Sequence, residues 1–206
     1  MNAFQRFARL TTDVVARRPW LWPVFRGPLR WMFDAIAPRW DTMRSPERLL
    51  AFEAALDVLP SSPRRALDLG TGTGDAALTV ARRWPETEVL GLDLSERMVA
   101  AAREKIPPEL ASRVRFDTAD ARRLPVPDSS FELVGLNNMI PFFDELARVT
   151  APGGHLVVAF SQGPQTPIYV SLDRVRSELE RRGFEVVREV PAGPGTAMVA
   201  RRRDSR

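Results

Sequence analysis

The chain has 206 residues, of which 44% are hydrophobic and 27% are charged, as expected for one globular domain with a sizeable core. No uncharged apolar run reaches the ~18–20 residues of a membrane-spanning helix, and the absence of cysteine excludes disulfide scaffolds and thiol catalysis. The single histidine, His155, makes a histidine-built metal site improbable, and the net charge of +4 does not by itself indicate nucleic acid, so we expect neither partner.

Residues 1–60 differ in composition from the rest of the chain. Residues 1–18 lack the long apolar stretch of a secretory signal, which makes a cytoplasmic location the default expectation. The segment 17–44 holds four of the five tryptophans, interleaved with arginines and interrupted by prolines that predict short helices and turns. Ser45 followed by Pro46 predicts a helix start. We therefore predict an N-terminal helical cap at 1–60 and a second unit at 61–206.

Strands and helices alternate from residue 64 onward. Apolar runs predict strands at 66–69, 89–94, 114–120, 131–137, 155–161, 184–190 and 196–201. Helical spacing predicts helices at 75–84, 96–105, 142–150 and 172–182, with Ser95 capping the second and Pro152-Gly153-Gly154 ending the third. This alternation predicts an α/β fold with a Rossmann-like, doubly wound, seven-stranded sheet. Because the last two strands are too close for a crossover helix, they should form a C-terminal antiparallel hairpin.

A glycine-rich turn, 68–75 (DLGTGTGD), follows the first predicted strand. The first strand-to-helix loop of a doubly wound sheet binds the ligand, and glycines let the backbone approach it closely. The dinucleotide pattern that starts at Gly70 would require glycine at position 75, where the chain has Asp75, so a nicotinamide oxidoreductase is disfavoured. Asp68 precedes the loop, where it would suit a cationic group better than a pyrophosphate.

Two more acids follow neighbouring strands. Asp93 lies 19 residues past Gly74, at the position where an acid holds a ribose diol. Asp120 ends the third predicted strand and is followed by Ala121. Together with Asp68, they suit a cofactor with a ribose, an exocyclic amine and a cationic amino-acid tail. The alternative for each aspartate taken singly is that it caps a helix or a turn.

These motifs resemble a known family. The stretches 68–74 (DLGTGTG), 92–98 (LDLSERM), 120–132 (DARRLPVPDSSFE) and 145–154 (ELARVTAPGG) are similar to class I S-adenosylmethionine-dependent methyltransferases, and the resemblance covers roughly residues 64–203. Upstream, 32–41 (MFDAIAPRWD) resembles a segment of the ubiquinone/menaquinone biosynthesis C-methyltransferase group, with Trp40 in place of the usual tyrosine.

The resemblance implies S-adenosyl-L-methionine as the cofactor and transfer of its methyl group to a small apolar or aromatic acceptor. The implied cofactor-binding residues are Asp68, Gly70, Thr71, Gly72, Gly74, Asp93, Leu94, Met98, Asp120, Ala121 and Asn137. In this set Asp68 and the glycine loop would hold the methionine moiety, and Asp93 the ribose. Leu94 or Met98 would flank adenine, Asp120 and Ala121 would read its edge, and Asn137 would lie near the transferred methyl group.

No catalytic base stands out, and none is required unless the acceptor must lose a proton. The stretches 137–145 and 161–171, which shape the acceptor pocket in the family, are short here. They motivate an alternative from another class, an inactive cofactor-binding protein with a regulatory or partner role. We expect acceptor contacts from Phe33, Trp40 and Tyr169, although Tyr169 is equally suited to anchor a packed loop.

The aromatic segment 17–44 admits three interpretations. It can bury its aromatic side chains over the sheet edge and the cofactor, or roof an acceptor pocket with Trp31, Phe33 and Trp40. It can also make weak contact with an anionic membrane surface, where tryptophan and arginine are favoured. We predict a cap with Phe33 and Trp40 turned inward.

Overall fold

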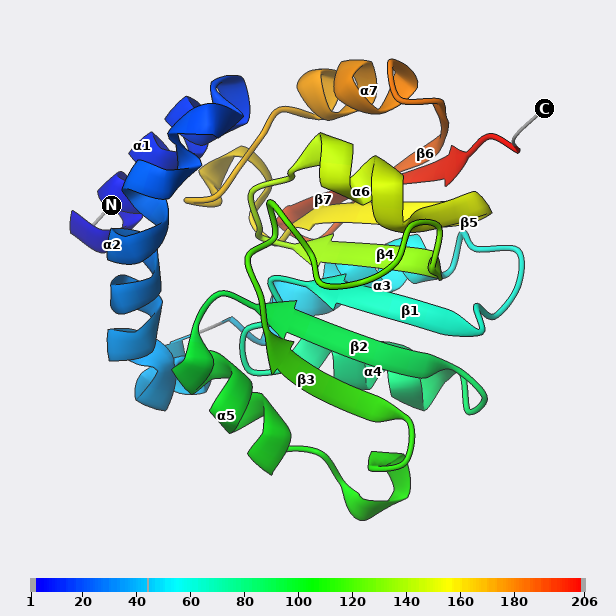
Figure 1. Cartoon of the computed structure of the whole chain (residues 1–206), viewed down its shortest axis with the longest axis horizontal. Helices are drawn as coiled ribbons and strands as arrows, with labels where there is room; N and C mark the ends of the chain where they lie inside the picture. Colours follow the sequence, from blue (N-terminus) through cyan, green and yellow to red (C-terminus); the bar gives the residue numbers. More distant parts are fainter. Residues whose placement is uncertain (1–2, 44, 205–206) are drawn as a thin grey trace.

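The computed structural model of the chain describes residues 3–43 and 45–204. Its seven strands form one sheet in the order β3-β2-β1-β4-β5-β7-β6 (Figure 1). Strands β1 to β5 pair in parallel, whereas β7 runs antiparallel to both β5 and β6. The predicted Rossmann-like fold and its C-terminal hairpin are thus confirmed. The strands are β1 (Arg65–Leu69), β2 (Glu88–Asp93), β3 (Val114–Thr118), β4 (Phe131–Asn137), β5 (Thr150–Phe160), β6 (Phe184–Ala192) and β7 (Gly195–Arg202).

Helices cover both faces of this sheet, with α3 and α4 behind it and α6 in front of it in Figure 1. Helices α3, α4 and α5 share one core cluster with the sheet, and α6 and α7 share the other. Because both faces are covered, the central strands are apolar almost throughout. The helices are α1 (Ala3–Arg17), α2 (Trp22–Ile36), α3 (Leu50–Leu56), α4 (Asp75–Arg83), α5 (Glu96–Glu104), α6 (Phe143–Val149) and α7 (Leu172–Glu180).

The strand order reverses at β1, which has β2 on one side and β4 on the other. In open α/β sheets the crevice at such a switch point, outside the carboxyl ends of the strands, is where ligands bind. Helices α1 and α2 lie beside this edge of the sheet, at the left of Figure 1. We call residues 3–43 the cap; residue 44, the last of the predicted aromatic segment, lies outside the described residues.

The prolines of the cap act in two ways. Pro19 and Pro38 stand in short 3-10 turns, as expected, but α2 runs for 15 residues through Pro23 and Pro28, so the expectation of a short helix was wrong there. Pro23 stands in the first turn of α2, where no hydrogen bond from its nitrogen is needed. Pro28 lies inside α2, and both Pro28 and Val24, whose carbonyl would have been its partner, are exposed to solvent. Water can therefore satisfy the free carbonyl, and the helix continues.

Other boundaries differ by a few residues. Strand β3 ends at Thr118, so Asp120 lies beyond it rather than at its end. Helix α6 ends at Val149, and Pro152-Gly153-Gly154 lie within β5, at a break in its register with β4. Gly153 has φ +73 there, a conformation that suits the bulge. No helix within the described ranges is long and apolar enough to span a membrane.

Candidate functional site

A cavity of about 280 Å³ lies at the carboxyl ends of the central strands. One part of its lining comes from the loops after β1, β2, β3 and β4, and the other part from the cap and the loop after β5. Of the predicted cofactor residues, the cavity is lined by Gly70, Gly72, Asp93, Leu94, Met98, Ala121 and Asn137. The remaining four, Asp68, Thr71, Gly74 and Asp120, lie behind this lining.

The glycine loop leaves no room for side chains on the cavity side. Gly70 has φ +73, and a Cβ there would lie 2.6 Å from Cγ of Met139. Gly72 has φ +55, and its Cβ would lie 3.3 Å from the indole nitrogen of Trp40. Gly74 serves a different purpose, because its Cβ would meet the ring of Phe116 at 2.7 Å inside the core. Two glycines therefore shape the cavity, and the third allows α4 to pack closely on the sheet.

Asp93 fixes the same loop from the end of β2. Its Oδ2 accepts a 2.8 Å hydrogen bond from the Gly72 amide, and its Oδ1 accepts one of 2.8 Å from the Ser95 amide. Burial raises the pKa of Asp93, although the backbone hydrogen bonds oppose this change. Each carboxylate oxygen keeps further acceptor capacity at the cavity wall, as a ribose diol requires.

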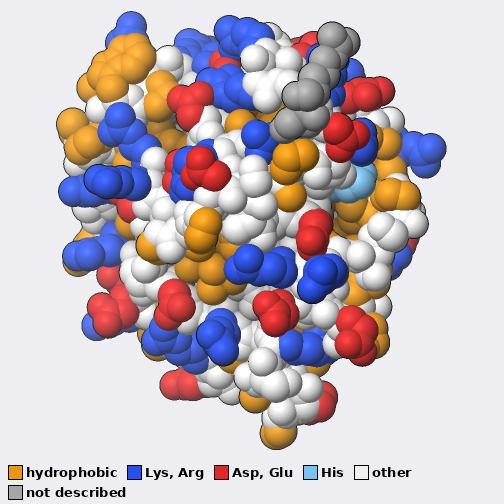
Figure 2. All heavy atoms as spheres, turned by 45° about the vertical axis from the view of Figure 1, so that its right-hand side comes forward, with side chains coloured by type: hydrophobic (Ala, Val, Ile, Leu, Met, Phe, Trp, Pro, Cys, Tyr) orange, Lys and Arg blue, Asp and Glu red, His pale blue; other side chains and the backbone are white. Residues whose placement is uncertain are grey.

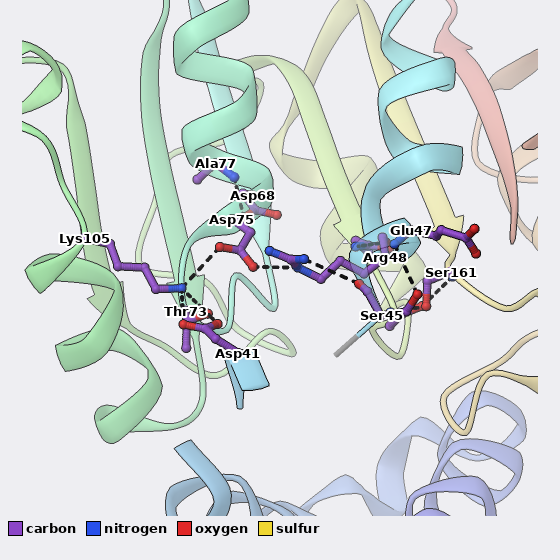
Figure 3. Close-up of polar contacts among 12 residues, drawn as sticks. Asp41, Ser45, Glu47, Arg48, Asp68, Thr73, Asp75, Ala77, Lys105 and Ser161 are labelled. Carbon is purple, nitrogen blue, oxygen red and sulfur yellow. Dashed lines mark hydrogen bonds and ion pairs between the residues drawn. The ribbon is translucent and has the colours of Figure 1, made fainter. Parts of the chain in front are cut away.

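Asp68 is buried and points toward the start of α4. Its Oδ2 accepts hydrogen bonds from the Thr71 hydroxyl at 2.6 Å and from the Ala77 amide at 3.1 Å (Figure 3). These contacts hold the glycine loop against the first turn of the helix. A contact between Asp68 and a cationic group of the cofactor stays a prediction.

Asp120 is bound by the cap. Its Oδ1 accepts a 2.7 Å hydrogen bond from the indole nitrogen of Trp22, and its Oδ2 pairs with Arg26 at 3.2 Å. Its neighbours Ala119 and Ala121 line the cavity. The role of Asp120 toward an adenine amine stays a prediction.

Asn137 presents an unused acceptor. Its amide nitrogen donates to the carbonyl of Arg48 at 3.1 Å, whereas its Oδ1 is buried and accepts no hydrogen bond from the described residues. A buried polar atom without a partner costs ~1–3 kcal/mol, so a donor from a ligand would offset this cost. Asn137 Oδ1 would suit a donor such as the amine of S-adenosyl-L-methionine. The glycine loop would let the backbone approach the cofactor closely, and the Asp93 carboxylate would suit its ribose.

The cap contributes aromatic side chains to the lining of the cavity. Phe33 and Trp40 both line the cavity and contact each other edge to face, with their ring centroids 5.7 Å apart. Trp31, which one interpretation placed beside them, points outward and is exposed. Tyr169 packs edge to face on Phe160 at 4.9 Å and is not part of the lining, which matches the loop-anchor alternative. Acceptor contacts from Phe33 and Trp40 stay predictions.

A polar network ties the end of the cap to the glycine loop (Figure 3). The ammonium group of Lys105 contacts Asp41 Oδ2 at 2.5 Å, Thr73 Oγ1 at 2.9 Å and Asp75 Oδ1 at 3.2 Å. Arg48 binds the other oxygen of Asp75 at 2.9 Å. Burial raises the pKa of Asp41, but hydrogen bonds from Lys105 and Thr73 outweigh this and hold it below its ordinary value.

The sequence did not identify Arg48, or the contribution of α1 to the cavity. Phe4, Gln5 and Ala8 of α1 are part of the lining, as is Arg48. The α1 residues reach the cavity only because the helix packs at the carboxyl edge of the sheet, and no local sequence motif marks these residues or Arg48.

Charged groups are scarce in the cavity, where Asp93 and Arg48 are the charged residues among the described lining. His155 lies at the opposite end of the sheet, beside Glu132 and Arg201. Burial and the neighbouring Arg201 lower its pKa. The face seen in Figure 2, which carries the histidine, shows Lys and Arg interspersed with Asp and Glu. Among the described residues of the cavity lining there is no histidine, lysine or tyrosine that could act as a base.

Comparison with known proteins agrees with this geometry. Residues 66–154 match the family model of a methyltransferase domain. The chain is 37% identical over 159 residues to a demethylmenaquinone methyltransferase of Deinococcus radiodurans, covering 70% of this chain and 64% of the relative. It is 44% identical over 142 residues to the enzyme of that name from Thermus thermophilus, covering 62% and 63%. The chain thus spans less than two thirds of the length of these relatives.

The fold is shared with solved structures. A SAM-dependent methyltransferase from Aquifex aeolicus superposes with a TM-score of 0.67 at 22% identity, covering 80% of this chain and 97% of that one. The sequence match, the fold and the site geometry agree with a class I S-adenosylmethionine-dependent methyltransferase domain, a class whose cofactor is S-adenosyl-L-methionine. Within that class, the chain stands close to the ubiquinone/menaquinone biosynthesis C-methyltransferase group.

Proposed function

We propose that the protein is an enzyme that methylates a ring carbon of a small aromatic acceptor of the quinol type. The observation that carries this proposal is the continuity of the cavity. Asp93 and the glycine loop line the same cavity as Phe33 and Trp40, so cofactor and acceptor would share one space. The names of the related demethylmenaquinone methyltransferases support a quinone-derived acceptor.

The bound cofactor supplies a methyl group on a positively charged sulfur, which is already activated for displacement. The chain must therefore place the acceptor carbon in line with that group and exclude water, which accounts for most of the catalysis needed. Helices α1 and α2 cover the cavity, and the rings of Phe33 and Trp40 offer an apolar surface for a flat acceptor. We infer that the cap performs the task that longer loops perform in other members of the class.

An ionised hydroxyl group on the acceptor would make its ring carbon nucleophilic. Arg48 lies in the cavity wall, where its positive charge would lower the pKa of a nearby acceptor hydroxyl. The carbon then gains the methyl group while the sulfur keeps the electron pair of the broken bond. The hydrogen that the carbon carried is lost as a proton to bulk water once the product leaves the cavity, which restores the aromatic ring. No side-chain base is needed in this scheme, which fits the composition of the lining.

The alternative of an inactive cofactor-binding protein has no observation in its favour. It was motivated by short loops at 137–145 and 161–171, yet residues of both stretches line the cavity and the cap closes it. A cytoplasmic location and the absence of nucleic-acid binding stay predictions.

A turnover assay tests the proposal. The protein is incubated with S-adenosyl-L-methionine and a chemically reduced, short-chain demethylmenaquinone, and mass spectrometry and NMR follow the product. We expect S-adenosylhomocysteine and a product with a new carbon-bound methyl group. Asp93→Ala should abolish turnover, whereas Asp117→Ala, an exposed acid on β3, should leave it intact. Cofactor binding without methylation of any quinol would overturn the proposal, and an oxygen-bound methyl group would overturn its assignment to carbon.

A further inference from the structure

The outward face of α2 carries large apolar side chains that nothing in the described chain covers. Trp20, immediately before the helix, is 64% exposed, and Val24 and Trp31 are 66% and 74% exposed. Val24, Pro28, Trp31 and Ala35 follow one another at helical spacing, so they form a single stripe, and all four are exposed. We call Trp20 and this stripe the outer row. The opposite side of α2 is also apolar, but it packs over the cavity through Trp22, Leu29 and Phe33.

Arginines flank the outer row. Arg17, Arg18 and Arg30 are exposed and form no ion pair with any described residue. The one acid between residues 14 and 40 is Asp34, and it faces the body of the protein. Its Oδ1 accepts a 2.6 Å hydrogen bond from the hydroxyl of Ser95 at the start of α5. The outer face of the cap therefore combines exposed tryptophan with arginines that form no ion pair with the described acids.

This combination has a specific chemical complement. Tryptophan is favoured at the interface between lipid headgroups and acyl chains, and arginine is attracted by anionic headgroups. The row lies on the solvent-exposed side of the cap, as suits insertion into a lipid surface. A partner protein would need a matching groove with acidic rims.

We propose that the outer row and its arginines dock the protein on an anionic lipid bilayer. A single helix, about 10 Å across, would then separate the bilayer from the cavity. One side of α2 would contact lipid while the other side contacts the cavity. The docking surface does not depend on the identity of the methyl acceptor, so it stands apart from the proposed activity.

Vesicle co-sedimentation of the full chain tests the proposal. The two preparations are phosphatidylcholine alone and phosphatidylcholine mixed with phosphatidylglycerol. We expect binding to the anionic vesicles, weakened by salt, together with a blue shift of tryptophan emission. Absence of binding to the anionic vesicles, or equal binding to both preparations, would overturn the proposal.

Two variants and two matched controls locate the surface. The first variant combines Trp20→Ser with Trp31→Ser, and the second combines Arg17→Gln, Arg18→Gln and Arg30→Gln. Each should weaken binding to the anionic vesicles about tenfold or more. For the second variant this follows because one arginine near an anionic surface contributes about fivefold. The controls are Val187→Ser, which removes an exposed apolar side chain on β6, and Arg82→Gln with Arg115→Gln and Arg188→Gln, which removes three exposed arginines elsewhere.

Both controls should bind vesicles like the unchanged protein. Affinity for S-adenosylhomocysteine, measured by calorimetry, should stay the same in every variant, which shows that the fold and the cofactor site are intact. Equal losses in variants and controls would overturn the proposal. So would sedimentation analysis showing that the outer row is buried in a dimer, which Trp31→Ser dissociates.

Discussion

Trp22 donates a 2.7 Å hydrogen bond to the carboxylate of Asp120, 98 positions further along the chain. The same indole contacts Phe142 edge to face, with the ring centroids 5.1 Å apart. Helix α2 is thereby attached to the loop after β3 and to the loop after β4 at once. Since Ala119 and Ala121 on either side of Asp120 line the cavity, movement of the cap and occupancy of the cavity should be coupled.

Trp22→Phe tests this coupling. Phenylalanine keeps an aromatic ring against Phe142 but cannot donate a hydrogen bond to Asp120. Hydrogen bonds to charged groups contribute ~1.5–3 kcal/mol, so the cap should open more often. We expect faster proteolysis within residues 3–43 and weaker binding of S-adenosylhomocysteine by calorimetry. Trp20→Phe, at an exposed position, is the control and should change neither.

A double-mutant cycle refines the test. If the two residues act through one bond, Trp22→Phe should add little to the effect of Asp120→Ala. Fully additive effects in the double variant would contradict the proposed coupling.

Asp93→Ala should weaken binding of S-adenosyl-L-methionine about tenfold or more, because each charge-assisted hydrogen bond to a ribose hydroxyl contributes ~1.5–3 kcal/mol. Asp93 also accepts hydrogen bonds from the amides of Gly72 and Ser95, so thermal unfolding must be recorded alongside calorimetry. Asp117→Ala serves as the control. Unchanged affinity in a folded Asp93→Ala protein would limit Asp93 to a role in holding the turn.

Gly70→Ala and Gly27→Ala form a matched pair of glycine replacements. At Gly70 the new Cβ would lie 2.6 Å from Met139 Cγ in a left-handed conformation, which costs ~1–2 kcal/mol before any clash. At Gly27, inside α2, no atom outside the adjoining residues and the helix backbone lies within 4 Å of the new Cβ, and alanine should stabilise the helix by ~0.5–1 kcal/mol. Urea unfolding should therefore show opposite signs. A shift in the same direction for both would contradict this assignment.

His155→Gln should change how stability depends on pH. Burial and Arg201 lower the pKa of His155 from 6.5, so the unfolded chain takes up the proton at a higher pH than the folded protein. Stability is therefore lost as pH falls below 6.5, until the folded histidine is protonated as well. We expect urea midpoints of the unchanged protein to decline over this interval and those of His155→Gln to decline less. Parallel profiles would contradict the assigned pKa.

Much of the sheet could be predicted because its strands are buried on both faces. The apolar run 131–137 matches β4 at both ends, and the capping roles of Ser45 and Ser95 are confirmed by hydrogen bonds to the amides of Glu47 and Met98. These features depend on neighbours in the sequence. The register break in β5 depends instead on its pairing with β4, so the sequence placed the start of this strand at His155, whereas β5 begins at Thr150.

The site was harder to predict where a side chain has a choice of partners. The pattern of strand-end acids located Asp68 and Asp120, but it did not reveal that Ala77 and Trp22 bind their carboxylates. Those donors approach through tertiary folding. The two tryptophans of α2 differ in their phase along the helix, which turns Trp22 toward the cavity and Trp31 toward solvent.

Lys105, held by Asp41, Thr73 and Asp75, is the only lysine of the chain. Its amine is therefore the only side-chain amine for amine-selective acylating reagents, and it is bound at the junction between the cap and the glycine loop. The extent to which such a reagent modifies Lys105 reports how often that junction opens. The protein thus carries a built-in chemical probe, readable by mass spectrometry of a single peptide, without any engineered label.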